Sequence, residues 1–69
     1  MEVFKSHETV FLHLLKGFGG QAIPKDIQEA KYAMEGKRKH PLGEKRVKSL
    51  LRKYGQGKYR FEGVYLFEE

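Results

Sequence analysis

The sequence predicts a small α+β domain in which three helices are followed by a C-terminal two-stranded β-hairpin. Two observations support this fold class. Three segments carry apolar residues at the spacing of one helical face, and breaks containing Gly or Pro separate them. After the third segment, two short runs rich in aromatic residues flank a Gly, which is typical of a hairpin. A chain of 69 residues is long enough for one domain with a small core.

The first expected helix covers residues 6–17, and residues 1–5 before it form either an arm or a short edge strand. Ser6 is a suitable N-cap because its hydroxyl can accept a hydrogen bond from an N–H of the first turn. The apolar stripe of this helix is the strongest core signal in the sequence, and it comprises Val10, Phe11, Leu14, Leu15 and Phe18.

The second expected helix covers residues 24–35 and follows a glycine-rich break at residues 17–20. This break lacks the Gly-Lys-Ser/Thr of a phosphate-binding loop, so we interpret it as a turn. Residues 21–23 are compatible with a short strand, and Pro24 suits the first turn of a helix. The apolar stripe of the second helix comprises Ile27, Ala30 and Met34.

The third expected helix covers residues 43–54 and is almost uniformly cationic outside its apolar stripe. A basic loop at residues 36–41 precedes it, and Pro41 cannot continue a helix, so the second and third helices are separate. Gly55 is expected at the C′ position, where it ends the helix. The apolar stripe falls at i, i+3, i+4 and i+7 and comprises Val47, Leu50, Leu51 and Tyr54.

The hairpin is expected over residues 58–67, with a two-residue turn at Glu62-Gly63. That turn places Phe61 opposite Val64 and sets the register of every other pair. One face of the hairpin is then wholly apolar and covers the helices; it comprises Tyr59, Phe61, Val64 and Leu66.

In the same register, Tyr65 and Phe67 lie on the outer face of the hairpin. Exposed aromatic residues on an edge hairpin favour self-association, so a homodimer through Tyr65 and Phe67, or docking of another protein, is expected. Two alternatives stay open. The rings could pack beneath the N-terminal residues Val3 and Phe4, or they could stack on unpaired bases.

Charge is distributed very unevenly along the chain, whose net charge is +5. Residues 1–35 contain four Lys and five acidic residues, and residues 62–69 contain three Glu. Between them, residues 36–61 contain ten Lys or Arg against Glu44 alone. Such a concentrated basic segment indicates a polyanionic partner, and the alternative is a solvated face of a protein that happens to be basic.

Several classes of function lack the residues that they require. With no Cys and no pairing of the three His residues, neither a metal site nor a cofactor is expected. One Asp, one Thr and two Ser form no visible nucleophile and base set, so we expect no enzyme. No apolar run approaches ~20 residues, and the N-terminus lacks a secretory signal pattern. We therefore expect an intracellular protein, cytoplasmic or nucleoid-associated, that does not bind a membrane.

The order of elements resembles the winged helix-turn-helix superfamily of DNA-binding proteins. The resemblance covers about residues 6–67 and rests on Gln-Ala-Ile at 21–23 before Pro24, the helical segment 44–51 and the hairpin after it. In that superfamily the third helix lies in the major groove and the hairpin wing reaches the backbone or minor groove. The resemblance implies that Arg60 contacts DNA from the wing, flanked by Lys58. It also implies that the third helix faces DNA with Lys45, Arg46, Lys48, Ser49, Arg52 and Lys53.

The basic loop before the third helix adds Lys37, Arg38 and Lys39 to the expected DNA contacts. Arginine can read guanine through its planar fork, whereas lysine more often contacts phosphate. The first hypothesis is therefore a double-stranded-DNA-binding protein, a transcriptional regulator or an accessory factor of a virus or mobile element. The alternative is a winged-helix protein–protein interaction module without nucleic-acid binding, and RNA binding is a weaker third possibility. A continuous basic surface would favour nucleic acid, and scattered cations would favour the interaction module.

Overall fold

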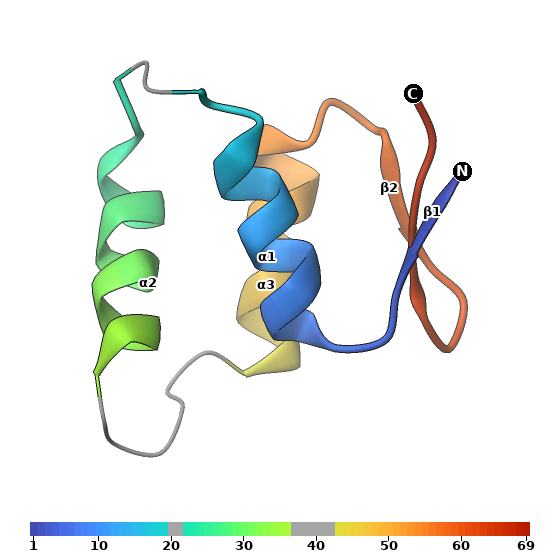
Figure 1. The fold of residues 1–69 in the computed structure, drawn as a ribbon, viewed down its shortest axis with the longest axis horizontal. Coiled ribbons are helices and arrows are strands. Elements are labelled where there is room, and N and C mark those ends of the chain that lie inside the picture. Colours follow the sequence, from blue (N-terminus) through green and yellow to red (C-terminus); the bar gives the residue numbers. More distant parts are fainter. Residues whose placement is uncertain (20–21, 37–42) are drawn as a thin grey trace.

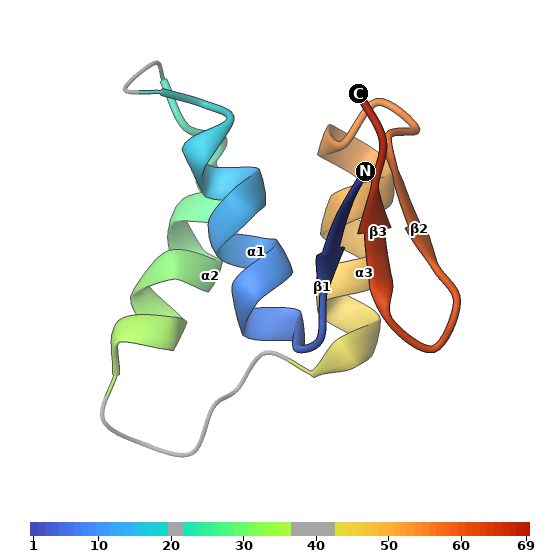
Figure 2. The same ribbon diagram turned by 45° about the vertical axis from the view of Figure 1, so that its right-hand side comes forward.

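The computed structural model describes residues 1–19, 22–36 and 43–69 of the chain (Figure 1). In order, the elements are β1 (Glu2–Phe4), α1 (His7–Lys16), α2 (Lys25–Glu35), α3 (Glu44–Tyr54), β2 (Tyr59–Phe61) and β3 (Tyr65–Phe67). The α+β class, the helices and the C-terminal strand pair are confirmed, and the ends of the helices agree with the expected ones to within one residue. The molecule measures 30 × 27 × 16 Å, with α2 at one end, the sheet at the other, and α1 and α3 between them (Figures 1 and 2).

The strands form an antiparallel sheet in the order β1-β3-β2. The N-terminal residues are thus an edge strand, the second of the two forms expected for them. By contrast, Ala22 and Ile23 are not in a strand, and Gln21 lies outside the described residues. Pro24 lacks an N–H for a sheet ladder, and the Ile23 carbonyl accepts a hydrogen bond from Gln28 Nε2 at 2.8 Å. The strand that joins the hairpin therefore precedes α1 instead of following it.

The expected register of the hairpin is wrong by one residue. Phe61 pairs with Tyr65, so the connection contains three residues, Glu62 to Val64, and the Glu62 N–H donates to the Val64 carbonyl at 2.9 Å. A two-residue type I′ turn needs positive φ at both positions, which Gly tolerates and Glu does not. In the three-residue connection, Gly63 alone takes a left-handed conformation, with φ 75°, so Glu62 does not need positive φ.

The changed register reverses the expected faces of β3. Tyr65 now lies on the side of the sheet that faces the helices and is only 4% exposed. Phe67 lies beside it, half-buried, with its ring centroid 4.9 Å from that of Tyr59. Leu66 instead lies opposite Arg60 on the outer face. The expected exposure of Tyr65 on the outer face is therefore wrong, and its ring is not available for the expected homodimer contact. Tyr65 lies opposite Phe4 in the neighbouring strand, and Phe4 packs against the core that contains Tyr65.

The core confirms the helical stripes predicted from the sequence. Residues from all three helices and one strand meet in it, and within the described part of the chain no charged side chain is buried. Leu15, Phe18, Met34 and Tyr54 pack at its edge. The buried residues are Val10, Phe11, Leu14, Ile27, Ala30, Val47, Leu50, Leu51 and Tyr65.

The helix ends agree with the sequence at both α1 and α3. Ser6 caps α1, because its hydroxyl accepts from the Thr9 N–H at 3.3 Å. Gly55 ends α3, as expected, with its backbone in the right-handed region at φ −83°. In the loop after α3, the residues with left-handed backbone are Gln56 and Gly57. Gly55 is needed for another reason: a Cβ would collide with the backbone of α3 and with the ring of Tyr59.

Leu50→Ala tests the apolar stripe of α3. The substitution removes a buried side chain that is 6% exposed, so we expect it to lower the free energy of unfolding by about 2–5 kcal/mol. Thermal and urea unfolding followed by circular dichroism would measure the change. Leu12→Ala is the matched control, because Leu12 is 56% exposed on α1 and its substitution should change the free energy of unfolding little. Equal effects of the two substitutions would contradict the assignment of the stripe.

Candidate nucleic-acid interface

One face of α3 brings together four of the residues predicted to contact DNA. They are spaced at i, i+3, i+4 and i+7, so they are neighbours on the helix surface and extend about 10 Å along its axis. We call this set the α3 basic face; it comprises Lys45, Lys48, Ser49 and Arg52, and it lines a shallow hollow of about 250 Å³. Lys45 and Arg52 form no ion pair with any residue in the described ranges, so their charges are available to a ligand.

A second hollow, of about 520 Å³, lies between α3 and the hairpin. Lys48 and Arg52 line both this hollow and the α3 basic face, so the two surfaces are continuous. We call it the α3–β2 groove, and its remaining lining residues are Leu51, Gly57, Tyr59, Arg60, Phe61 and Tyr65.

Phe61 gives this groove a feature that the sequence did not indicate. Its ring is on the helix-facing side of the sheet, as expected, but it is 41% exposed because β2 ends beside the groove. Lys48 Nζ lies 3.8 Å from the centroid of the ring. Lys48 also pairs with Glu44 at 3.1 Å.

Two more predicted contacts on α3 lie on its other flank. Lys53 Nζ is 3.2 Å from Asp26 Oδ2 on α2, and the Tyr54 hydroxyl donates to the second oxygen of the same carboxylate. Arg46, seven residues before Lys53, shares that flank of the helix. It is exposed and makes no ion pair with a described residue. The expected set on the third helix is therefore divided between two flanks.

The contacts within the Asp26 cluster shift the pKa of each of its members. The hydrogen bond from Tyr54, followed by the interactions with Lys53, lowers the pKa of the Asp26 carboxyl below its ordinary value. The hydrogen bond with Asp26 raises the pKa of Lys53, and together with burial it raises the pKa of the Tyr54 hydroxyl. Asp26 thus balances the charge of Lys53 and links α2 to α3, so Lys53 is less available to a polyanion than Lys45.

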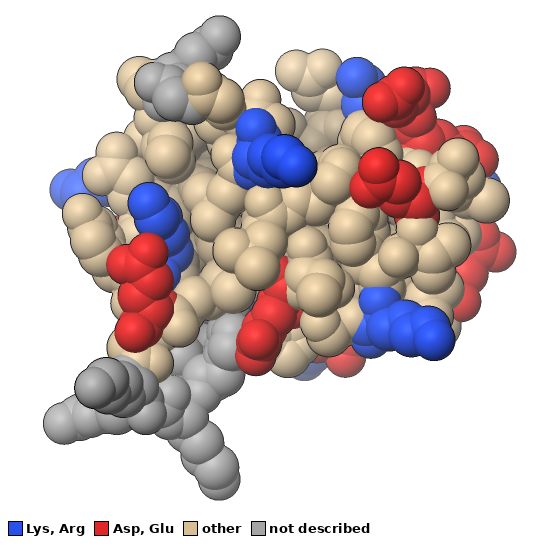
Figure 3. All heavy atoms as spheres, viewed as in Figure 1, with Lys and Arg blue, Asp and Glu red and all other residues tan. Residues whose placement is uncertain are grey.

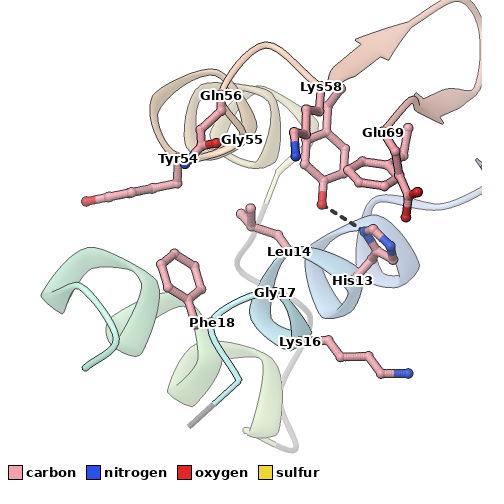
Figure 4. A pocket seen from close by; sticks show the side chains of 12 residues that line it. His13, Leu14, Lys16, Gly17, Phe18, Tyr54, Gly55, Gln56, Lys58 and Glu69 are labelled. Atoms are coloured by element: carbon pink, nitrogen blue, oxygen red, sulfur yellow. Dashed lines mark hydrogen bonds between the residues drawn. The ribbon is translucent and has the colours of Figure 1, made fainter. Parts of the chain in front are cut away.

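The expected wing contact is already paired with acidic residues. Arg60 Nε lies 2.7 Å from Glu62 Oε2, and its Nη2 lies 3.8 Å from Glu68 Oε1. Lys58 lines a different cavity, of about 480 Å³, together with Lys16 and Glu69 (Figure 4). The structure therefore does not join Lys58 to the α3 basic face. Lys37, Arg38 and Lys39, the predicted loop contacts, lie outside the described residues.

The cavity of Figure 4 also shows a contact that the sequence missed. His13 lies outside the apolar stripe of the first helix, yet its Nδ1 lies 2.8 Å from the Tyr59 hydroxyl (Figure 4). Its Nε2 lies 3.3 Å from Glu2 Oε2. The ring also packs against Phe4 and Phe67. Burial, with a smaller effect of Glu2, raises the pKa of Tyr59 to about 12. We interpret this cluster as the link between α1 and the sheet.

The opposite side of the molecule has a different charge pattern. In Figure 1, α1 lies in front of α3, whose apolar stripe packs inward. The same view in space-filling form shows separate basic side chains, and acidic side chains gather at the end that carries the sheet (Figure 3). On the face drawn in this view, the basic side chains of the described residues therefore stand apart from one another instead of forming one patch (Figure 3).

Three further observations bear on the class of protein. The described residues hold no group of three or more His, Cys, Asp or Glu placed to bind a metal ion. Among the helices of the described ranges, none is long and apolar enough to cross a bilayer. No protein-family model, curated protein or solved structure matches the chain.

Asp26→Asn tests the link between α2 and α3. A carboxyl whose pKa is lowered by folding stabilises the folded state above its unfolded pKa and loses that contribution as pH falls through the folded value. We expect Asp26→Asn to lower Tm at pH 7 and the difference from wild type to shrink below about pH 4, where the wild type loses the same contribution.

Melting curves from pH 7 to pH 2.5 would measure the effect of Asp26→Asn. Glu29→Gln, an exposed acid on the same helix, is the control and should follow the wild type more closely. A constant difference between wild type and Asp26→Asn over the whole pH range would show that the carboxylate contacts do not stabilise the fold.

Proposed function

We propose that this chain is a DNA-binding protein of the winged-helix type that contacts duplex DNA through the α3 basic face. One observation carries the proposal: Lys45 and Arg52 lie on a single exposed stripe and form no ion pair with a described residue, and Lys48 lies between them. A helix of 11 residues is about 16 Å long, and the major groove, about 12 Å wide, admits one.

The residues of the α3 basic face would have different tasks. Arg52 has the planar fork that can donate two hydrogen bonds to guanine, and Ser49 can donate to or accept from a base edge. Lys45 and Lys48 would neutralise phosphates and so fix the position of the helix without reading sequence. Arg46, on the flank toward α2, would contact a phosphate at the edge of the footprint.

The hairpin contributes less to DNA binding in this proposal than a typical wing. Glu62 lies at its tip and Glu68 near its end, and both pair with Arg60. Phosphate would be repelled by these carboxylates, so the hairpin mainly packs on the helices through Tyr65. The protein would act as a small intracellular regulator or accessory factor, with a second copy on an adjacent half-site because one domain covers a limited footprint.

The alternative is a protein-interaction module without nucleic-acid binding. It is favoured by the pairing of Lys53 and Arg60 with carboxylates, which leaves fewer free cations than the sequence indicates. The continuity of the α3 basic face with the α3–β2 groove favours the first proposal.

Fluorescence anisotropy with a labelled random duplex across a salt series tests the proposal. We expect micromolar binding and a steep fall of log K with log salt, since each neutralised phosphate contributes about −0.9 to the slope. The double variant Lys45→Ala/Arg52→Ala should bind more weakly, and its slope should be reduced by up to about two such contributions.

The control for this experiment is Lys25→Ala/Lys31→Ala, which removes the same charge from exposed positions of α2. The proposal is contradicted if both double variants lose affinity equally, because net charge alone would then explain binding. Absence of binding at low salt would exclude the nucleic-acid function and leave the interaction module.

A further inference from the structure

The α3–β2 groove has an aromatic and aliphatic floor. Leu51 and Tyr65 are buried at its base, and Tyr59 is half-buried beside them. Phe61 stands at the edge of the groove with 41% of its surface exposed, and its ring centroid lies 4.9 Å from that of Tyr65. An exposed ring beside a hollow of about 520 Å³ offers a flat apolar surface to a ligand of moderate size.

Cations lie on the α3 side of this floor. Lys48 Nζ sits over the Phe61 ring at 3.8 Å from its centroid, and Arg52 also lines the groove. Acidic side chains are paired with two cations of the groove: Glu44 pairs with Lys48, and Glu62 and Glu68 pair with Arg60. An anionic ligand would therefore enter from the side of Arg52 and would be repelled at the tip of the hairpin.

We propose that the α3–β2 groove binds an unpaired base of single-stranded DNA, a proposal that rests on nucleic-acid binding by the α3 basic face. A base has a flat π-face for Phe61, and its phosphate carries the charge that Lys48 and Arg52 require. On binding, the base would take the place of the Lys48 ammonium over the ring, and the flexible lysine would turn to the phosphate.

One further feature fits a nucleotide in this groove. Lys48 and Arg52 are shared with the α3 basic face, so one strand can contact both surfaces.

The proposal assigns single-strand binding and duplex binding to different residues. Bases inside a duplex are stacked on each other and cannot place a face on Phe61, so only an unpaired strand uses the groove. Duplex binding depends on the cations of α3 and is indifferent to the ring. Phe61 therefore distinguishes single strands from duplexes, whereas Arg52 contributes to both.

The test uses a single-stranded DNA oligonucleotide that contains 2-aminopurine, and a duplex of the same length. Stacking on an aromatic side chain changes the fluorescence of 2-aminopurine, which reports contact independently of affinity. We expect Phe61→Leu to weaken single-strand binding by about tenfold and to abolish the fluorescence change, while duplex affinity stays as in the wild type. The matched control is Tyr32→Leu, which removes an aromatic ring that is 70% exposed on α2 and should change neither quantity.

The experiment distinguishes failure of the groove proposal from failure of duplex binding by the α3 basic face. If wild type binds the duplex but Phe61→Leu and Tyr32→Leu bind the single strand equally well, the groove proposal is overturned and the α3 basic face is unaffected. If the wild-type chain binds neither DNA at low salt, both proposals fail. Circular dichroism confirms that Phe61→Leu is folded, and the fluorescence change with wild-type protein tests stacking without any substitution.

Discussion

The packing of the apolar stripe of α3 against α1 is the contact on which the rest of the structure depends. Val47 and Leu50 are buried in it, and each fixes the rotation of α3 about its axis. Because a helix has 3.6 residues per turn, burying this stripe forces Lys45 and Arg52 outward on the opposite face. The basic character of that face is thus a consequence of how the core forms, and any binding by it is coupled to the stability of this packing.

The sheet also contributes to the core, but its register could not be predicted from the sequence as well as the helices could. The helices could be predicted because their periodicity extends over 10 or 11 residues and needs no knowledge of distant partners. Each strand has only three residues, so its two faces are decided by the loop between strands. One extra residue in the connection after Phe61 moved Tyr65 from the expected outer face into the core.

In the candidate site, too, features set within one helix could be predicted from the sequence, and contacts between distant residues could not. The stripe from Lys45 to Arg52 follows from spacing within one helix, and its exposure could be predicted. The pairing of Lys53 with Asp26 joins residues 27 positions apart, and no local pattern signals it. The groove beside Phe61 likewise depends on how β2 packs against α3. Charge composition therefore predicts a polyanionic partner, while the packing of helices and sheet decides which cations of the described residues are without an ion pair.

The most direct test of DNA contact by the α3 basic face is a titration of ¹⁵N-labelled protein with a short duplex, followed by amide chemical shifts. We predict that the largest shifts fall on Lys45, Lys48, Ser49 and Arg52, with small changes in α2, because the duplex would lie along one side of α3. Shifts confined to α2 or spread evenly over the molecule would contradict contact through this face. An unchanged spectrum at low salt would contradict DNA binding altogether.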